Sequence, residues 1–298
     1  AEALRLEGPI AISLEGTADT SGAGRHDFTG TVRGRGIGYG RIVTAEFRSD
    51  VRVRANTNVF ENVRGRIFGT EFEGDATVVS GQTGRGGESR YRARCRFHNA
   101  DFGRVVQAFR VGADDQHEGK LSADFALAGP IATNHAERVR GEGNVKIRDG
   151  RVFMLPVFGP FSDYMAKIVP GLDFVLRQGD AHAEFILEGG RFRSDDVNIE
   201  GDVLSLSAKG SYGLDQSLDF EAQVKLLKSH PFVGKLLRLV TWPISKLFEF
   251  RVRGTLENPE WYPRNFSTEL LERIGIKNSE EKQKRAPSPE SEAKGSEW

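Results

Sequence analysis

Cysteine is nearly absent from this sequence, since Cys95 is the only one among 298 residues, and this excludes an internal disulfide. Net charge is absent too: 42 Lys and Arg balance 42 Asp and Glu. With no overall field to attract nucleic acid, we expect no nucleic-acid partner. No apolar run reaches the roughly 20 residues of a membrane-spanning helix. The sequence begins Ala1-Glu2-Ala3, without methionine or an apolar signal core, so we expect it to have been processed or excised from a longer chain.

Motifs for catalysis and metal binding are also scarce. The six histidines are scattered, without HxxxH or HExxH spacing, and no GxSxG nucleophile motif or paired-carboxylate arrangement occurs. Asp114 and Asp115 with His117 are the best metal candidate, but adjacent carboxylates alternate in direction and are typical of polar turns. We therefore expect no enzyme activity, no metal site and no cofactor.

Two glycine-rich segments suggest ligand loops at first sight. The glycines from Gly34 to Gly40 are spaced strictly by two, which matches neither the dinucleotide-binding motif nor the P-loop and predicts a strand or bend. Arg85-Gly86-Gly87 resembles an RNA-binding tract, but it is isolated in a neutral chain and predicts a turn.

Alternation of apolar and polar residues is the clearest pattern in the chain. Between residues 90 and 97 every second residue is arginine, and these arginines alternate with apolar residues, Cys95 among them. Successive side chains of a strand point to opposite faces, so this segment is predicted to be a strand with one arginine face and one apolar face. The arginine face is expected to bind anionic headgroups or, as the simpler alternative, to be a solvated surface that blunts edge-to-edge aggregation.

The same alternation recurs along the chain, separated by turn signals such as Asp149-Gly150 and Gly189-Gly190. Only 38% of the residues are apolar and 35 are glycine, which favours strands buried on one face over a thick core. The predicted fold class is mainly β, a long antiparallel sheet with two short amphipathic helices and a disordered C-terminal tail. We expect one face of this sheet to be polar and to carry Arg92, Arg94, Glu184 and Lys209. The other face is expected to be one continuous apolar surface that carries Phe125, Val145, Ile147, Phe185, Leu187, Val197, Ile199, Leu204, Leu206, Phe220 and Val224.

Two segments predict helices. The first runs over about 157–169, with Pro160 in its first turn and Pro170-Gly171 at its end. The second runs over about 230–248, is basic and amphipathic, and is expected either to lie on a membrane or to plug an open end of the sheet. Its apolar side is expected to carry Phe232, Leu236, Leu239, Val240, Trp242 and Leu247.

Residues 141–156, which read GEGNVKIRDGRVFMLP, resemble the C-terminal region of the AsmA-like family, the group that includes TamB and YhdP. In that family a strand of the form G-x-G-x-aliphatic-x-aliphatic-x-D-G leads to Leu-Pro and a short helix. Residues 192–201 and 204–212 resemble the strands that follow, and residues 252–259 resemble a closing V-x-G-T-L-x-x-P strand. The resemblance covers about 119–266.

Three segments are expected on this basis. Residues 1–118 form a β-groove segment that shares only the strand pattern, residues 119–266 form the AsmA-like C-terminal β region, and residues 267–298 form a short helix and a disordered tail. The resemblance implies a U-shaped β-groove whose apolar interior passes phospholipid from the inner toward the outer membrane. It implies a place in the periplasm, tethered to the inner membrane through a segment absent from this chain.

The implied partners are phospholipid acyl chains and, at the C-terminal end, a membrane surface or envelope proteins. The alternative is a structural or assembly module of the cell envelope with no lipid conduit, in which the apolar faces pack against each other. An open trough at least as wide as an acyl chain favours the lipid groove, and a dry packed core favours the alternative.

Overall fold

One antiparallel sheet dominates the protein. The computed structural model describes residues 4–6, 8–19, 26–39, 42–81, 87–109, 117–131, 136–168, 179–202, 204–226 and 248–266. Its strands are β1 (Leu4–Leu6), β2 (Ile10–Ala18), β3 (His26–Gly34), β4 (Ile37–Tyr39), β5 (Ile42–Thr44), β6 (Phe47–Arg54), β7 (Thr57–Ile67), β8 (Thr70–Val79), β9 (Arg90–Asp101), β10 (Lys120–Pro130), β11 (Arg140–Gly150), β12 (Gly179–Glu188), β13 (Arg191–Gly201), β14 (Leu204–Gly213), β15 (Ser217–Leu226), β16 (Phe248–Thr255) and β17 (Pro259–Pro263). Its helices are α1 (Phe102–Phe109), α2 (Gly159–Ile168) and the short 3₁₀ helices η1 (Ala136–Arg138), η2 (Val152–Met154) and η3 (Pro156–Phe158).

Fourteen strands form the large sheet, and almost every strand pairs with its neighbour in the sequence. The exception is the pairing of β3 with β6, because β4 and β5 leave the large sheet and join β1 in a separate three-stranded sheet. Among the described residues the large sheet is open, with β2 and β17 at its two edges. The predicted mainly β, antiparallel fold class is confirmed.

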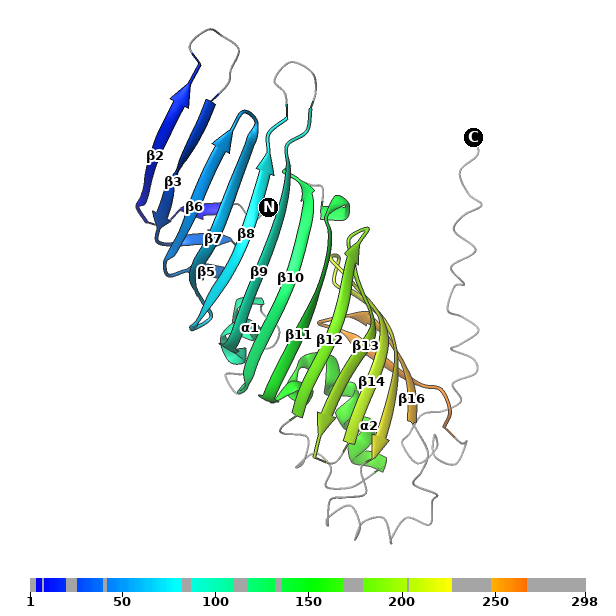
Figure 1. Ribbon diagram of the computed structural model, residues 1–298. Helices are drawn as coiled ribbons and strands as arrows, with labels where there is room; N and C mark the ends of the chain where they lie inside the picture. The colour runs from blue at the N-terminus through cyan, green and yellow to red at the C-terminus, as the bar shows by residue number, and fades with distance from the viewer. Residues whose placement is uncertain are drawn as a thin grey trace, which may run out of the picture.

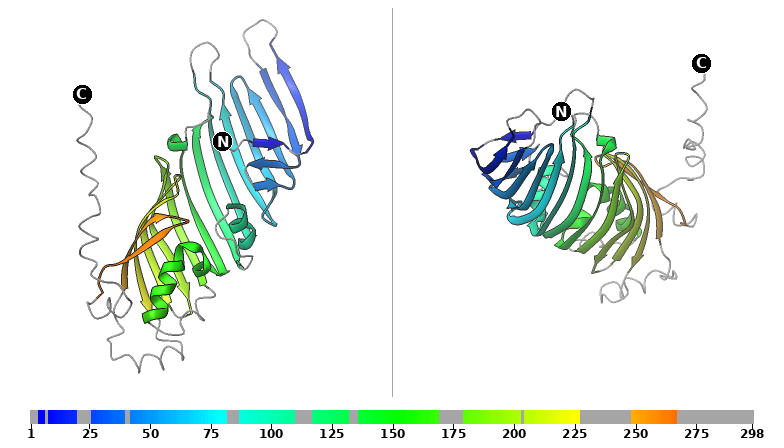
Figure 2. Two further views of the ribbon diagram at one scale, coloured as in Figure 1. Left: turned by 180° about the vertical axis from the view of Figure 1, so that it is seen from behind. Right: turned by 45° about the horizontal axis from the view of Figure 1, so that its top comes forward.

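Figures 1 and 2 show that the sheet twists and curves along its length. The three-stranded sheet, α1 and α2 all lie on its concave side, as the left view of Figure 2 shows. The predicted helix over 157–169 is confirmed as η3 followed by α2. Of the predicted helix over 230–248, only Phe248 is described, and it begins strand β16 instead. The rest of that helix and the tail from 267 lie outside the described residues, as do Arg85, Asp114 and Asp115.

The strand register confirms the alternation predicted for residues 90–97. On the concave side Phe97 pairs with Ala123 and Cys95 pairs with Phe125, whereas on the convex side Arg96 pairs with Asp124. The Arg96 Nε donates to an Asp124 carboxylate oxygen at 2.9 Å. However, β9 lies between β8 and β10 in the middle of the sheet, so its arginines cannot protect an edge, and that part of the expectation was wrong.

Two local features differ from the sequence-based expectation. Asp149-Gly150 is not a hairpin turn: the register with β12 shifts between Ile147 and Gly150, and Asp149 has a φ of 50°, so the pair forms a bulge at the end of β11. Helix α1 was not predicted. Its first turn is capped by Asp101, whose Oδ1 accepts a hydrogen bond from the Arg104 backbone N–H at 3.2 Å.

Cys95 gives a prediction that tests the assigned face. Burial, with a further contribution from the Asp124 carboxylate, raises the pKa of the Cys95 thiol to about 11 from an ordinary value of 9.0. Because alkylation requires the thiolate, we expect iodoacetamide at pH 8 to modify the folded chain roughly 100-fold more slowly than the urea-unfolded chain. Equal rates in the two states, followed by mass spectrometry, would place Cys95 on the solvent side.

Candidate ligand-binding groove

The residues predicted to line an apolar surface all lie on the concave side of the sheet. Their positions follow from register: Phe125 pairs with Gly143, which pairs with Phe185. Farther along the sheet, Ile199 pairs with Leu206, which pairs with Val224. Val145, Ile147, Leu187, Val197, Leu204 and Phe220 occupy the same side by the same alternation, and Arg92, Arg94, Glu184 and Lys209 occupy the other. Their contact with lipid stays a prediction.

Part of this concave surface is covered by a dry core. Phe161 of α2 is fully buried, and its ring lies 4.9 Å from Trp261 and 5.8 Å from Phe250, centroid to centroid. The Trp261 indole N–H donates to the Val157 carbonyl oxygen at 2.7 Å, which fastens η3 to β17. Leu204, with 0% exposure, belongs to the same buried cluster. At this end the sheet is therefore sealed by its own helices.

Next to the sealed region the concave surface holds a cavity of about 620 Å³. This volume lies within the range of about 300–1,000 Å³ that is usual for small-ligand sites. Its floor comes from β13 to β16, its walls include Phe109 of α1 and Phe158 of η3, and Gln216 and Glu257 are among its few polar lining residues. The other lining residues are Val157, Val197, Ile199, Leu206, Ala208, Tyr212, Leu218, Phe220, Ala222, Val252, Leu256 and Trp261.

Tyr212 is a hydrogen-bond donor within this apolar lining. Burial, together with the nearby Asp215 carboxylate, raises the pKa of the Tyr212 hydroxyl above its ordinary value, so the hydroxyl keeps its proton at neutral pH. The Tyr212 ring lies 6.3 Å from that of Phe192, which lies 5.4 Å from that of Phe185. These three rings extend the apolar floor from the cavity toward β12.

The concave surface of the N-terminal half is open. On β2 the side chains of Ile12 and Leu14 are 62% and 44% exposed. Their neighbours across β3, Val32 and Gly30, are only half-buried. The sequence predicted one continuous apolar surface, whereas the structure divides the concave side into an open part at β2 and β3, a buried core under α1 and α2, and a cavity beside that core. The buried core and the exposed apolar residues of β2 therefore occur on the same side of one sheet.

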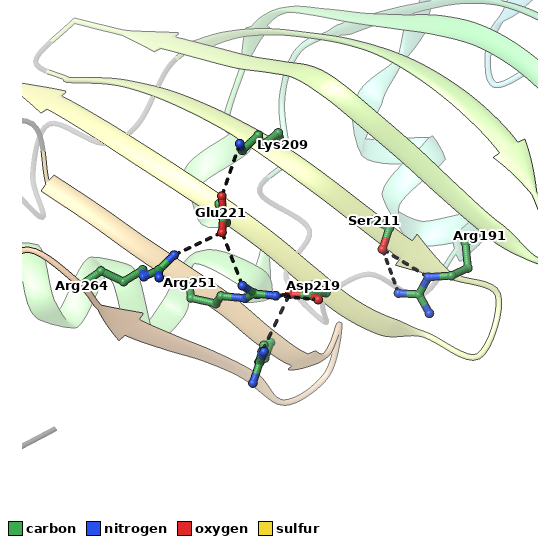
Figure 3. Close-up of polar contacts among 8 residues, drawn as sticks. Arg191, Lys209, Ser211, Asp219, Glu221, Arg251 and Arg264 are labelled. Atoms are coloured by element: carbon green, nitrogen blue, oxygen red, sulfur yellow. Dashed lines mark hydrogen bonds and ion pairs between the residues drawn. The ribbon is translucent and has the colours of Figure 1, made fainter. Parts of the chain in front are cut away.

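Ion pairs hold the convex side of the strands that floor the cavity (Figure 3). Arg251 donates two hydrogen bonds of 2.9 Å to the Asp219 carboxylate. Glu221 lies 3.5 Å from Lys209, 3.4 Å from Arg251 and 3.2 Å from Arg264. Each carboxylate thus joins side chains of neighbouring strands, and this fixes the register of the cavity floor from behind.

Sequence reasoning missed two residues that line the cavity, Phe109 of α1 and Trp261 of the edge strand β17. Phe109 belongs to a helix that was not predicted, although Phe102, Val106 and Phe109 have the spacing of one helix face. Trp261 lies just after the closing motif at 252–259 and was not assigned a role, although its aromatic ring and indole N–H are typical of a buried anchor.

Comparison with family models, curated proteins and solved structures finds no match to this chain, so the AsmA-like resemblance stays a prediction from its motifs. In the part of the chain that the structure describes, no helix combines the length and the apolar character needed to span a membrane. Within the same residues, no three His, Cys, Asp or Glu side chains are grouped so that they could hold a metal ion.

Proposed function

We propose that this chain is the lipid-binding β-groove module of a bacterial envelope protein and that it passes phospholipid between the inner and outer membranes. The observation that carries the proposal is the apolar cavity of about 620 Å³ on the concave side of an open sheet. Apolar surface left in contact with water is costly in proportion to its area, and acyl chains relieve this cost.

The motif order at residues 141–259 adds to this proposal, because the AsmA-like family that it resembles implies phospholipid as the cargo. On the same resemblance we place the protein in the periplasm, tethered to the inner membrane through a segment outside this chain. The proposal assigns no catalytic role to the chain.

A second candidate is a structural or assembly module with no lipid conduit. The sealed aromatic core around Phe161 and Trp261 favours it, because this part of the concave surface is already filled by protein. The two functions make opposite predictions for the cavity: a conduit fills it with acyl chains, whereas a structural module leaves it without a specific lipid.

Filling the cavity tests the proposal. Ala208 lines the cavity, so Ala208→Trp places an indole where we expect an acyl chain to lie. The purified chain is mixed with a lipid extract, separated from unbound lipid and measured by native mass spectrometry. We expect the wild-type chain to retain phospholipid and Ala208→Trp to lose most of it.

The matched control is Gln223→Trp, which adds the same side chain to the adjacent strand at an exposed position on the convex side. We expect this control to keep the lipid. If wild type carries no lipid, or if both variants keep it equally, the cavity is not the lipid site and the structural module is the better explanation.

A further inference from the structure

Three arginines stand directly opposite one another on the convex side of the N-terminal half. In the register of β3, β6 and β7, Arg33 pairs with Arg48 and Arg48 pairs with Arg64. Adjacent strands are only about 4.8 Å apart, so three positive charges lie within two strand spacings. Like charges placed directly opposite each other in a sheet destabilise it.

These arginines line a shallow basin of about 690 Å³. Its charged residues are five arginines and two glutamates, so the basin carries a surplus of positive charge although the whole chain is neutral. All seven charged side chains are exposed. The charged lining comprises Arg33, Arg35, Arg48, Arg64, Arg66, Glu46 and Glu71.

The five arginines have no ion-pair partner within the residues that the structure describes. The contrast with the other end of the sheet is clear, because there Arg251 and Arg264 are held by Asp219 and Glu221. Even on the same row of the convex side, the next arginine toward the C-terminus is paired, since Arg96 lies 3.6 Å from Glu73 and 2.9 Å from Asp124. The basin arginines therefore leave positive charge available to an external anion.

We propose that this arginine basin docks the β2 end of the sheet onto a membrane surface rich in anionic phospholipid headgroups. A guanidinium group pairs with phosphate through two parallel hydrogen bonds. The basin is shallow and its arginines are exposed, which suits a plane of headgroups better than one enclosed ligand. This docking does not require the concave surface to carry lipid.

The test is sedimentation with vesicles of phosphatidylcholine alone or of phosphatidylcholine mixed with phosphatidylglycerol. We expect the wild-type chain to bind only the mixed vesicles, and added salt to weaken the binding by screening. Replacing Arg33, Arg48 and Arg64 together with glutamine is expected to lower the partition coefficient on the order of 100-fold, the effect of three basic residues at an anionic surface.

A control variant with the same change in net charge distinguishes the effect of the basin arginines on vesicle binding from the effect of net charge alone. Arg90, Arg92 and Arg94 are exposed on the convex side of β9, outside the basin. Replacing these three with glutamine is expected to leave most of the binding in place. Thermal unfolding completes the control, because removing opposed like charges should keep or raise the melting temperature of the basin variant.

Three results would overturn the proposal. Wild type that does not bind the mixed vesicles, or equal losses in the two triple variants, would show that the basin is not a docking site for anionic membranes. If inorganic pyrophosphate protects the basin arginines from phenylglyoxal while vesicles do not bind, the ligand is a soluble phosphate compound instead. None of these results depends on lipid retention in the cavity.

Discussion

Replacing Phe161 with alanine is expected to lower the free energy of unfolding by about 3 to 5 kcal/mol, as for large aromatic residues removed from a packed core. Phe161 is fully buried, and its ring contacts the rings of Phe153, Phe250 and Trp261. No solvent can fill the space left by this ring without wetting an apolar core, so α2 loses its main attachment to β16 and β17.

The matched control is Phe109→Ala, because Phe109 also extends from a helix on the concave side but is 59% exposed. Its replacement is expected to change the unfolding free energy by less than about 0.5 kcal/mol. Urea unfolding followed by tryptophan fluorescence measures both variants, since Trp261 reports on the core. Similar small losses in the two variants would mean that α2 is not packed on the sheet as described.

A charge placed at two positions of the same concave surface is expected to have opposite consequences. Phe220 lines the cavity and is half-buried, so in Phe220→Arg the guanidinium group can reach water and the fold is retained. Leu204 is fully buried in the core cluster, and Leu204→Glu leaves an unpaired charge there at a cost of several kcal/mol. Phe220→Arg should abolish lipid retention in the folded protein, whereas Leu204→Glu should unfold it.

Photo-crosslinking to a lipid with an acyl-chain diazirine, measured beside the melting temperature, separates these effects. The lipid-groove proposal expects crosslinking in wild type, lost crosslinking with a nearly unchanged melting temperature in Phe220→Arg, and collapse of the melting temperature in Leu204→Glu. Unfolding of both variants, with no lipid crosslinked to wild type, would instead support a sealed structural module.

The faces of the strands could be predicted from the sequence because the side-chain period of a strand is two. Phe97 and Leu206 stand on the apolar side for the same reason that Arg96 and Lys209 stand on the other. The alternating pattern did not predict helix α1, because this helix is only eight residues long and follows directly after a twelve-residue strand. The capping contact from Asp101 to the Arg104 N–H is the local signal that identifies its start.

What covers the apolar side could not be predicted in the same way. Leu204 and Phe220 occupy equivalent positions in the alternating pattern, yet Leu204 lies in the sealed core and Phe220 lines a cavity. The difference arises from where η3, α2 and Trp261 pack, and these contacts join residues about 100 positions apart, such as Val157 and Trp261. A local pattern contains no information about contacts at that separation.

The pairing of each strand with its neighbour in the sequence also determines how the sheet can fold and how strands can be added to it or removed from it. Because nearly every strand of the large sheet bonds to the strand next to it in the chain, the sheet is close to a one-dimensional array. In such arrays stability is a sum of local units and their interfaces, and folding can begin at one hairpin and propagate. Adding or deleting a whole antiparallel pair near β6 to β9 would therefore change the length of the trough while leaving its cross-section the same.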